Sequence, residues 1–261
     1  MNTNPAWGGG EKWHLQTALA LRQRGYKVFF IARPASPLAL QVKANGLPLE
    51  ELRIGNLSFL NPFKNHLLRQ WFKQNKIEAV FLNNMTDLYS GAKTAKQAGV
   101  RRTIFRRGLD VPVNNNLVNR HAFRYADLVV PISRACLDNM LLQNPAMFSR
   151  EKVKIISIGL DLKAFDRVTP RPVRGEQQEL VIGNAGRLCS QKAQTHLVDL
   201  ACELKKTTAA FKILIAGTGP ERRNLEQYAE KKKVSDKVVF LGFVKKIQDL
   251  LAAVDIFVLT S

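Results

Sequence analysis

The sequence has no run of about eighteen apolar residues, so no segment is predicted to span a membrane as a helix. It also lacks a charged start followed by an apolar core, so we expect no secretory signal. Histidine and cysteine are scarce, and neither shows metal-binding spacing, so we expect no metal site. The three cysteines cannot all pair, which is typical of a reducing compartment: Cys136, Cys189 and Cys202.

Acidic residues are also few. The chain has 21 Asp and Glu against 40 Lys and Arg, which gives a formal net charge of +19. This excess says nothing about the fold. It does indicate an anionic partner, with nucleic acid, an acidic membrane face and a phosphorylated glycolipid as the candidate classes.

A chain of 261 residues with 46% hydrophobic residues is long enough for two compact domains. Apolar runs of strand length alternate with segments of helical periodicity, which predicts parallel β-sheets covered by helices. Residues 168–179 are polar and contain two prolines and a glycine, so they are predicted to form a linker. We therefore expect an α/β protein with two Rossmann-like domains, residues 1–167 and 180–261.

The most informative stretch is 180–192, in which an apolar strand stops at two glycines and two cations follow. A strand, a glycine turn and a helix start present backbone N–H groups and a positive dipole end to an anion. Arg187 adds a planar fork for phosphate oxygens, and Lys192 adds a compact charge. The stretch predicts a diphosphate site before a helix over 191–206. On spacing alone, an ordinary turn with both cations in water is the alternative.

Three motifs carry a family resemblance: Gly-Arg-Leu-x-x-x-Lys at 186–192, Ala-Gly-Thr-Gly-Pro at 216–220 and Val-Phe-Leu-Gly-Phe-Val at 239–244. Together they resemble the retaining group 1 glycosyltransferases of the GT-B fold. The resemblance implies that Arg187 and Lys192 hold the pyrophosphate of a nucleotide-sugar donor.

The same resemblance gives the nucleotide-binding candidates. Gly217 and Gly219 suit a close approach of the backbone to a ligand. Phe243 and Val244 follow a predicted strand over 238–241, and the resemblance implies that they lie beside the nucleotide base. Core packing is the alternative for Phe243.

Near the N-terminus, Gly8, Gly9 and Gly10 lead into a predicted helix over 11–24 and a predicted strand over 27–32. This looks like the first glycine loop of the same family, usually Gly-Gly-x-Glu before the helix. The resemblance implies that Gly9 and Gly10 meet the donor phosphate and the acceptor. A flexible leader is the alternative.

Both ends depart from the family pattern. A Rossmann half begins with a buried strand, and residues 1–7 contain no apolar run able to form it. The sequence stops at residue 261, where the family continues into a glycine turn and two glutamates that contact the sugar and the ribose. We therefore expect a chain truncated at both ends, with little activity by itself.

A basic strand is predicted over 101–107, and Asp110 follows in a turn before a proline. Strand ends are where α/β sheets place chemistry. In the resembling family this turn carries a polar residue that faces the transferred sugar, which makes Asp110 the candidate catalytic residue. Arg106 and Arg107 are the candidates beside an anionic acceptor. A role in organising the turn is the alternative for Asp110.

The predicted helix over 62–75 is basic and amphipathic, with Phe63, Leu67, Trp71 and Phe72 on one side. Such a helix is able to lie on an anionic membrane surface. The alternative is a helix packed on the sheet with a solvated basic face.

The resemblance implies a hexosyltransferase that moves a sugar from a nucleotide-sugar donor with retention of configuration, without a metal or other cofactor. The basic segments suggest an anionic glycolipid or oligosaccharide acceptor, such as a lipopolysaccharide core. We expect a cytoplasmic protein, peripheral on the inner face of the cytoplasmic membrane. A non-catalytic protein that binds polyanions or nucleic acid is the alternative, although no recognised nucleic-acid module is present.

Overall fold

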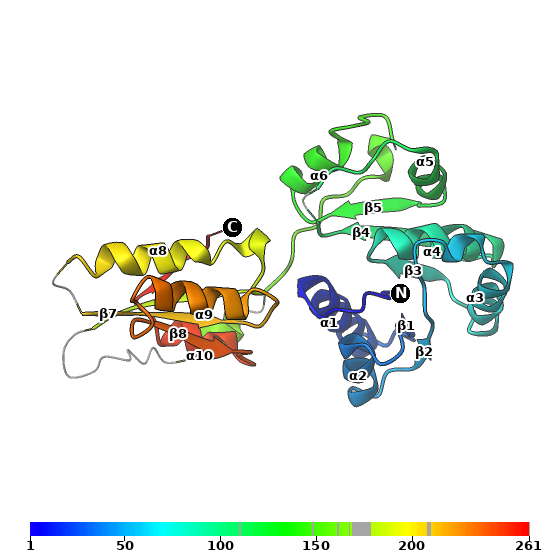
Figure 1. The fold of residues 1–261 in the computed structure, drawn as a ribbon. Coiled ribbons are helices and arrows are strands. Elements are labelled where there is room, and N and C mark those ends of the chain that lie inside the picture. The colour runs from blue at the N-terminus through cyan, green and yellow to red at the C-terminus, as the bar shows by residue number, and fades with distance from the viewer. Residues whose placement is uncertain are drawn as a thin grey trace. The chain divides into compact units, whose positions relative to one another are not determined.

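The computed structural model describes residues 1–109, 111–147, 149–160, 162–166, 168, 179–207 and 210–260. The chain divides into two compact units, Met1–Gly159 (unit 1) and Leu160–Ser261 (unit 2). Each unit contains parallel β-strands and α-helices (Figure 1), which confirms the predicted α/β fold with two Rossmann-like parts. Most of the predicted linker, 168–179, lies outside the described residues, so its linker role stays a prediction.

The strands of unit 1 are β1 (Phe30–Ala32), β2 (Leu49–Glu51), β3 (Ala79–Leu82), β4 (Arg102–Arg107) and β5 (Leu128–Pro131). Strands β1 and β2 pair in parallel, and β3, β4 and β5 form a second parallel sheet.

Residues 1–3 lie between these two sheets. Asn2 bridges Ala32 in parallel, and the amino group of Met1 donates a 2.7 Å hydrogen bond to the carbonyl of Phe81 in β3. Residues 1–3 therefore take the place of the expected first strand. An apolar run is not needed there, because the pairing uses backbone groups and the side chain of Asn2 bonds to Glu11.

The helices of unit 1 are α1 (Gly9–Gln23), α2 (Pro37–Ala44), α3 (Pro62–Gln74), α4 (Met85–Gln97), α5 (Leu117–Arg124) and α6 (Arg134–Leu141), with 3₁₀ turns at Ser58–Leu60 and Arg150–Lys152. Five of these helices begin at a side chain that accepts a hydrogen bond from the N–H three residues on: Ser36, Asn61, Asn84, Asn116 and Ser133. The predicted start of the first helix at residue 11 is wrong, because Gly9 and Gly10 already form its first turn.

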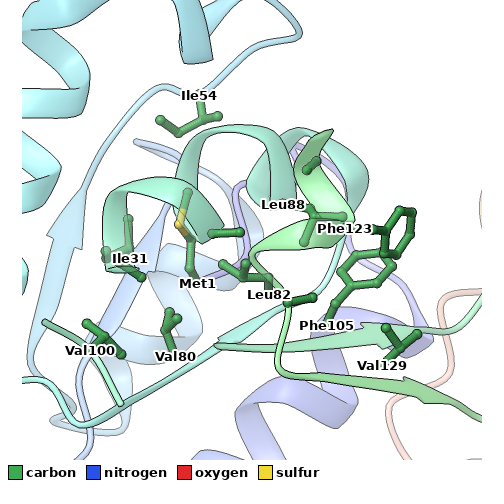
Figure 2. Packing of buried hydrophobic residues seen from close by; sticks show 14 of the residues in the cluster. Met1, Ile31, Ile54, Val80, Leu82, Leu88, Val100, Phe105, Phe123 and Val129 are labelled. Carbon is green, nitrogen blue, oxygen red and sulfur yellow. The ribbon is translucent and has the colours of Figure 1, made fainter. Parts of the chain in front are cut away.

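A cluster of buried side chains holds the sheet of β3, β4 and β5 against the helices of unit 1. Figure 2 shows Met1 within this cluster, together with Leu82 and Leu88. Phe105 of β4 and Phe123 of α5 pack edge to face, with ring centroids 5.5 Å apart. This packing fixes β4, and with it the arginines at the end of that strand.

The predicted apolar side of helix α3 is only partly buried. Leu68 and Phe72 are buried, but Phe63 and Leu67 are 80% and 61% exposed. The ring of Trp71 packs against Phe29 at 5.8 Å. The helix therefore packs on the sheet through one stripe and keeps a second apolar stripe at the surface.

Unit 2 contains β6 (Leu180–Ala185), β7 (Phe211–Ala216), β8 (Val238–Gly242) and β9 (Ile256–Phe257), which form one parallel sheet in the order β8-β7-β6-β9. Its helices are α7 (Leu162–Asp166), α8 (Thr195–Leu204), α9 (Arg222–Lys231) and α10 (Ile247–Ala252), with a 3₁₀ turn at Ser190–Lys192. The core of unit 2 joins α8 and α9 to β7 through buried side chains such as Leu197, Leu225 and Ile213.

The predicted helix over 191–206 is wrong at its start. Lys192 lies in the 3₁₀ turn, and Ala193 has a left-handed backbone with φ of 46°. An α-helix cannot continue through that conformation, so α8 begins at Thr195.

Candidate functional site

The carboxyl ends of three neighbouring strands of unit 2 carry loops that bond to one another. Gly186 follows β6, Gly217 follows β7 and Gly242 ends β8. The amide of Leu188 donates to the carbonyl of Thr218 at 3.0 Å, and the amide of Gly217 donates to the carbonyl of Gly242 at 2.7 Å. These loops lie at the edge where parallel α/β sheets bind ligands.

Only glycine fits at positions 217 and 219 in this arrangement of hydrogen-bonded loops. A Cβ on Gly217 would overlap the carbonyl oxygen of Gly186, and one on Gly219 would overlap the carbonyl oxygen of Leu188. The φ of Gly217 is also +143°, which side chains rarely adopt. The close approach that the sequence predicts is therefore present between two backbone segments of the chain itself, and contact with a nucleotide stays a prediction.

Arg187 and Lys192 lie on one loop, between β6 and α8. The side chain of Arg187 is exposed, and Lys192 is half-buried with its aliphatic stem against Gly186. The loop is fixed from inside, because Gln194 donates to the carbonyl of Arg187 at 3.1 Å and Thr260 donates to the carbonyl of Lys192 at 2.6 Å. The structure thus brings the two predicted cations to the same edge of the sheet as the glycine loops.

Phe243 and Val244 follow the glycine that bonds to Gly217. Phe243 is 68% exposed and Val244 is half-buried. The alternative of core packing for Phe243 is therefore wrong, and a place beside a nucleotide base stays a prediction.

In unit 1, the first turn of α1 packs against the ends of β3 and β4. A Cβ on Gly10 would lie 3.0 Å from Nδ2 of Asn83 and 3.8 Å from Nη1 of Arg106. Nη1 of Arg106 donates to Oδ1 of Asn83 at 3.1 Å, and its guanidinium carbon lies 4.3 Å from the centroid of the Trp13 ring. Arg106 is 3% exposed, and burial lowers the pKa of its guanidinium. Gly9 precedes this contact and has open space where a Cβ would stand.

Arg107 lies in a separate environment. Successive residues of a strand point to opposite faces, and Arg107 donates through Nη2 to the carbonyl of Val111 at 2.9 Å. It is 5% exposed, and burial lowers the pKa of its guanidinium. Among the described residues, its buried Nε has no hydrogen-bond partner. The two arginines predicted to act together therefore contact different groups. Asp110 lies outside the described residues, so its catalytic role stays a prediction.

Sequence reasoning missed Asn83, His14 and Gln194. Asn83 directly follows the apolar run of β3, so the rule that chemistry lies at strand ends would have found it. His14 is buried beside Phe30, with ring centroids 5.6 Å apart, and its Nδ1 has no hydrogen-bond partner in the described part of the chain. Burial, then the amino terminus and Arg106, lower the pKa of His14 well below 6.5, which keeps the ring neutral at pH 7. No sequence pattern pointed to Gln194, because its hydrogen bond to the carbonyl of Arg187 depends on the left-handed turn at Ala193.

Two negative observations apply to the described residues. No three of their His, Cys, Asp and Glu side chains gather as a metal site requires. None of their helices is long and apolar enough to cross a membrane.

Family models match both parts of the chain. The model of Glycosyltransferase Family 4 matches residues 7–164, which is more than half of the sequence. The chain belongs to this family. The model of glycosyl transferases group 1 matches residues 168–261, and the resemblance to group 1 glycosyltransferases is thereby confirmed.

Individual proteins agree with the family. The chain is 27% identical over 215 residues to a GDP-mannose-dependent monoacylated alpha-(1-6)-phosphatidylinositol monomannoside mannosyltransferase from Corynebacterium glutamicum, covering 77% of this chain and 55% of that protein. Crystalline HepE from Anabaena in complex with UDP superposes with a TM-score of 0.75 at 20% identity, covering 100% of this chain and 72% of that one. The lipopolysaccharide outer core galactosyltransferase WaaB superposes with a TM-score of 0.68 at 17% identity, covering 100% and 74%.

These structural neighbours confirm the GT-B fold for the whole chain. The chain spans between 21% and 55% of the length of the curated relatives it matches.

Proposed function

We propose that the protein is a retaining glycosyltransferase that binds the diphosphate of a nucleotide-sugar donor at the loops of unit 2. The observation that carries the proposal is the joint placement of Arg187 and Lys192 beside the glycine loops that follow β6 and β7. Family membership supports it, and so does the UDP bound to HepE.

The chemistry of this site is electrostatic. As the bond to the sugar breaks, negative charge grows on the leaving diphosphate, and fixed cations lower the energy of that charge. Arg187 offers two parallel N–H donors to phosphate oxygens, and Lys192 offers a compact charge. In this proposal Phe243 and Val244 border the base, Asp110 faces the transferred sugar, and no metal is required.

The acceptor is proposed to be anionic. A net charge of +19 favours a glycolipid or oligosaccharide that carries phosphate, such as a lipopolysaccharide core. The relative from Corynebacterium acts on a phosphatidylinositol mannoside and WaaB on a lipopolysaccharide core, which supports an acceptor of this class. Such acceptors lie at a membrane, so we propose a peripheral protein on the inner face of the cytoplasmic membrane.

The test is a thermal-shift titration of the whole chain with UDP, GDP and ADP. We expect one nucleotide to raise the melting temperature, because a ligand that binds only the folded state stabilises it. Arg187→Ala and Lys192→Ala should each weaken that nucleotide's binding about tenfold or more, since each removes charge-assisted hydrogen bonds.

Lys231→Ala is the matched control, since it removes the same charge from the last turn of α9, at the other end of unit 2. Equal weakening by Lys231→Ala, or no shift with any of the three nucleotides, would contradict the proposal.

A further inference from the structure

A basic pocket lies in unit 1, apart from the groups described above. It has a volume of about 390 Å³, within the range of small-molecule sites. Three cations line it, Arg33, Arg53 and Lys64, together with the hydroxyl of Ser58 and the side chain of Leu57. No carboxylate of the described residues is part of the lining.

The pocket lies at the edge of the sheet where ligands bind. Arg33 directly follows β1, and Arg53 comes two residues after the end of β2. Both are therefore at carboxyl ends of parallel strands. Lys64 comes from the first turn of α3, whose positive dipole end adds to the charge of the pocket.

The side chain of Lys64 is held in place without a counter-ion. Nζ of Lys64 donates to the carbonyl of Arg53 at 2.9 Å and to Oγ of Ser58 at 3.4 Å. Within the part of the chain that the structure describes, none of the three cations forms an ion pair with a carboxylate. Glu51, at the end of β2, bonds to Lys43 instead.

Three uncompensated cations around one pocket repel each other, and an anion that contacts all three removes this repulsion. A phosphate group fits the set, because its oxygens accept from two guanidinium groups, an ammonium group and a hydroxyl at once. Phosphate diesters and monoesters share this chemistry, whether they belong to a soluble molecule or to a lipid headgroup.

We propose that this pocket binds a phosphate group of the acceptor. That the ligand is an acceptor rests on the proposed glycosyltransferase function, but the phosphate site itself rests on the pocket alone. This pocket replaces Arg106 and Arg107 as the proposed contact of the acceptor anion, because the guanidinium groups of those two arginines are buried and bonded within the protein.

The test is calorimetric titration of the whole chain with sn-glycerol 3-phosphate. Lys64→Gln and Arg53→Gln should each weaken binding about tenfold or more, because each removes one charged donor. Lys73→Gln is the matched control, since it removes one charge from the far end of the same helix. Lys192→Ala is a second control, which detects glycerol phosphate that binds at the loops of unit 2 and not in the pocket. Both controls should leave the affinity unchanged.

Three results would overturn the inference: no binding, equal weakening by Lys73→Gln, or loss of binding by Lys192→Ala alone. Vesicles of phosphatidylcholine with and without phosphatidic acid then separate the sources. If vesicles with phosphatidic acid bind and Lys64→Gln weakens that binding, the pocket takes a lipid headgroup. If these vesicles do not bind but glycerol phosphate does so in a Lys64-dependent way, the pocket takes a soluble ligand.

The nucleotide shift in the same samples keeps the two proposals apart. Lys64→Gln should leave the rise in melting temperature with the nucleotide unchanged. A Lys64-dependent phosphate affinity without any nucleotide shift would support the pocket and contradict the donor site.

Discussion

The two units place positive charge at the carboxyl ends of their strands in opposite ways. In unit 1, Arg106 and Arg107 are buried, and packing against Trp13 and Asn83 fixes the first of them. In unit 2, the side chain of Arg187 is exposed, and its loop is held by close backbone contacts with two glycines and by hydrogen bonds from Gln194 and Thr260 to its carbonyls. In unit 1 the arginine side chains are therefore themselves packed, whereas in unit 2 the backbone of the loop is fixed and the arginine side chain is left exposed.

The largest expected effect comes from removing the backbone fit of unit 2. Gly217→Ala places a methyl group on the carbonyl oxygen of Gly186 and at a φ of +143°. We expect the free energy of unfolding of unit 2 to fall by more than about 3 kcal/mol, because strain and overlap act together. All three tryptophans, Trp7, Trp13 and Trp71, lie in unit 1. Urea unfolding followed by circular dichroism should therefore shift without a shift in tryptophan fluorescence.

Gly186→Ala is the control for that variant. Its Cβ would meet the stem of Lys192 at an ordinary 3.7 Å. The expected cost is below about 1 kcal/mol. If both variants unfold at the same urea concentration as the wild type, backbone fit does not determine the loop of unit 2.

A second prediction concerns the buried charge of unit 1. Asp87 is fully buried, and burial raises the pKa of its carboxyl from 3.8 to about 6, against hydrogen bonds from Thr3 and the charge of the amino terminus. The folded state thus holds this proton more tightly than the unfolded state does. The contribution of Asp87 to stability is complete below about pH 3.8 and is lost as the pH rises through 6.

Asp87→Asn removes this titration. Relative to the wild type, the free energy of unfolding of the variant should rise by about 2 kcal/mol between pH 4 and pH 6. Urea unfolding followed by tryptophan fluorescence measures it in unit 1. Asp138→Asn changes an exposed carboxylate of the same unit and should show less than about 0.5 kcal/mol of change over that interval. A difference between Asp87→Asn and wild type that does not vary with pH would disprove the raised pKa.

The contrast between the units also shows what the sequence could reveal. The loop with Arg187 and Lys192 was predictable, because strand, glycines and cations are consecutive in the chain. Gly10 and Arg106 were candidates from the sequence, but their meeting at Asn83 was not predictable, because the three residues come from segments that meet only in the folded sheet. The start of α8 was mispredicted for a local reason, since periodicity does not report the left-handed backbone of Ala193. The pocket of Arg33, Arg53 and Lys64 needed the pairing of β1 with β2, which sequence patterns do not encode.

The smallest expected effect is the sharpest comparison of the two units, because it removes one strand-end arginine from each. Arg106→Ala should lower the free energy of unfolding of unit 1 by between about 1 and 2 kcal/mol, since Asn83 loses a donor and Trp13 loses its cation and its packing. Arg187→Ala should change the stability of unit 2 by less than about 0.5 kcal/mol, because the side chain is exposed and Gln194 bonds only to its carbonyl. Urea unfolding by fluorescence and by circular dichroism measures each unit. A stability loss in Arg187→Ala as large as in Arg106→Ala would mean that side-chain packing supports both sites, and the distinction between the units would be wrong.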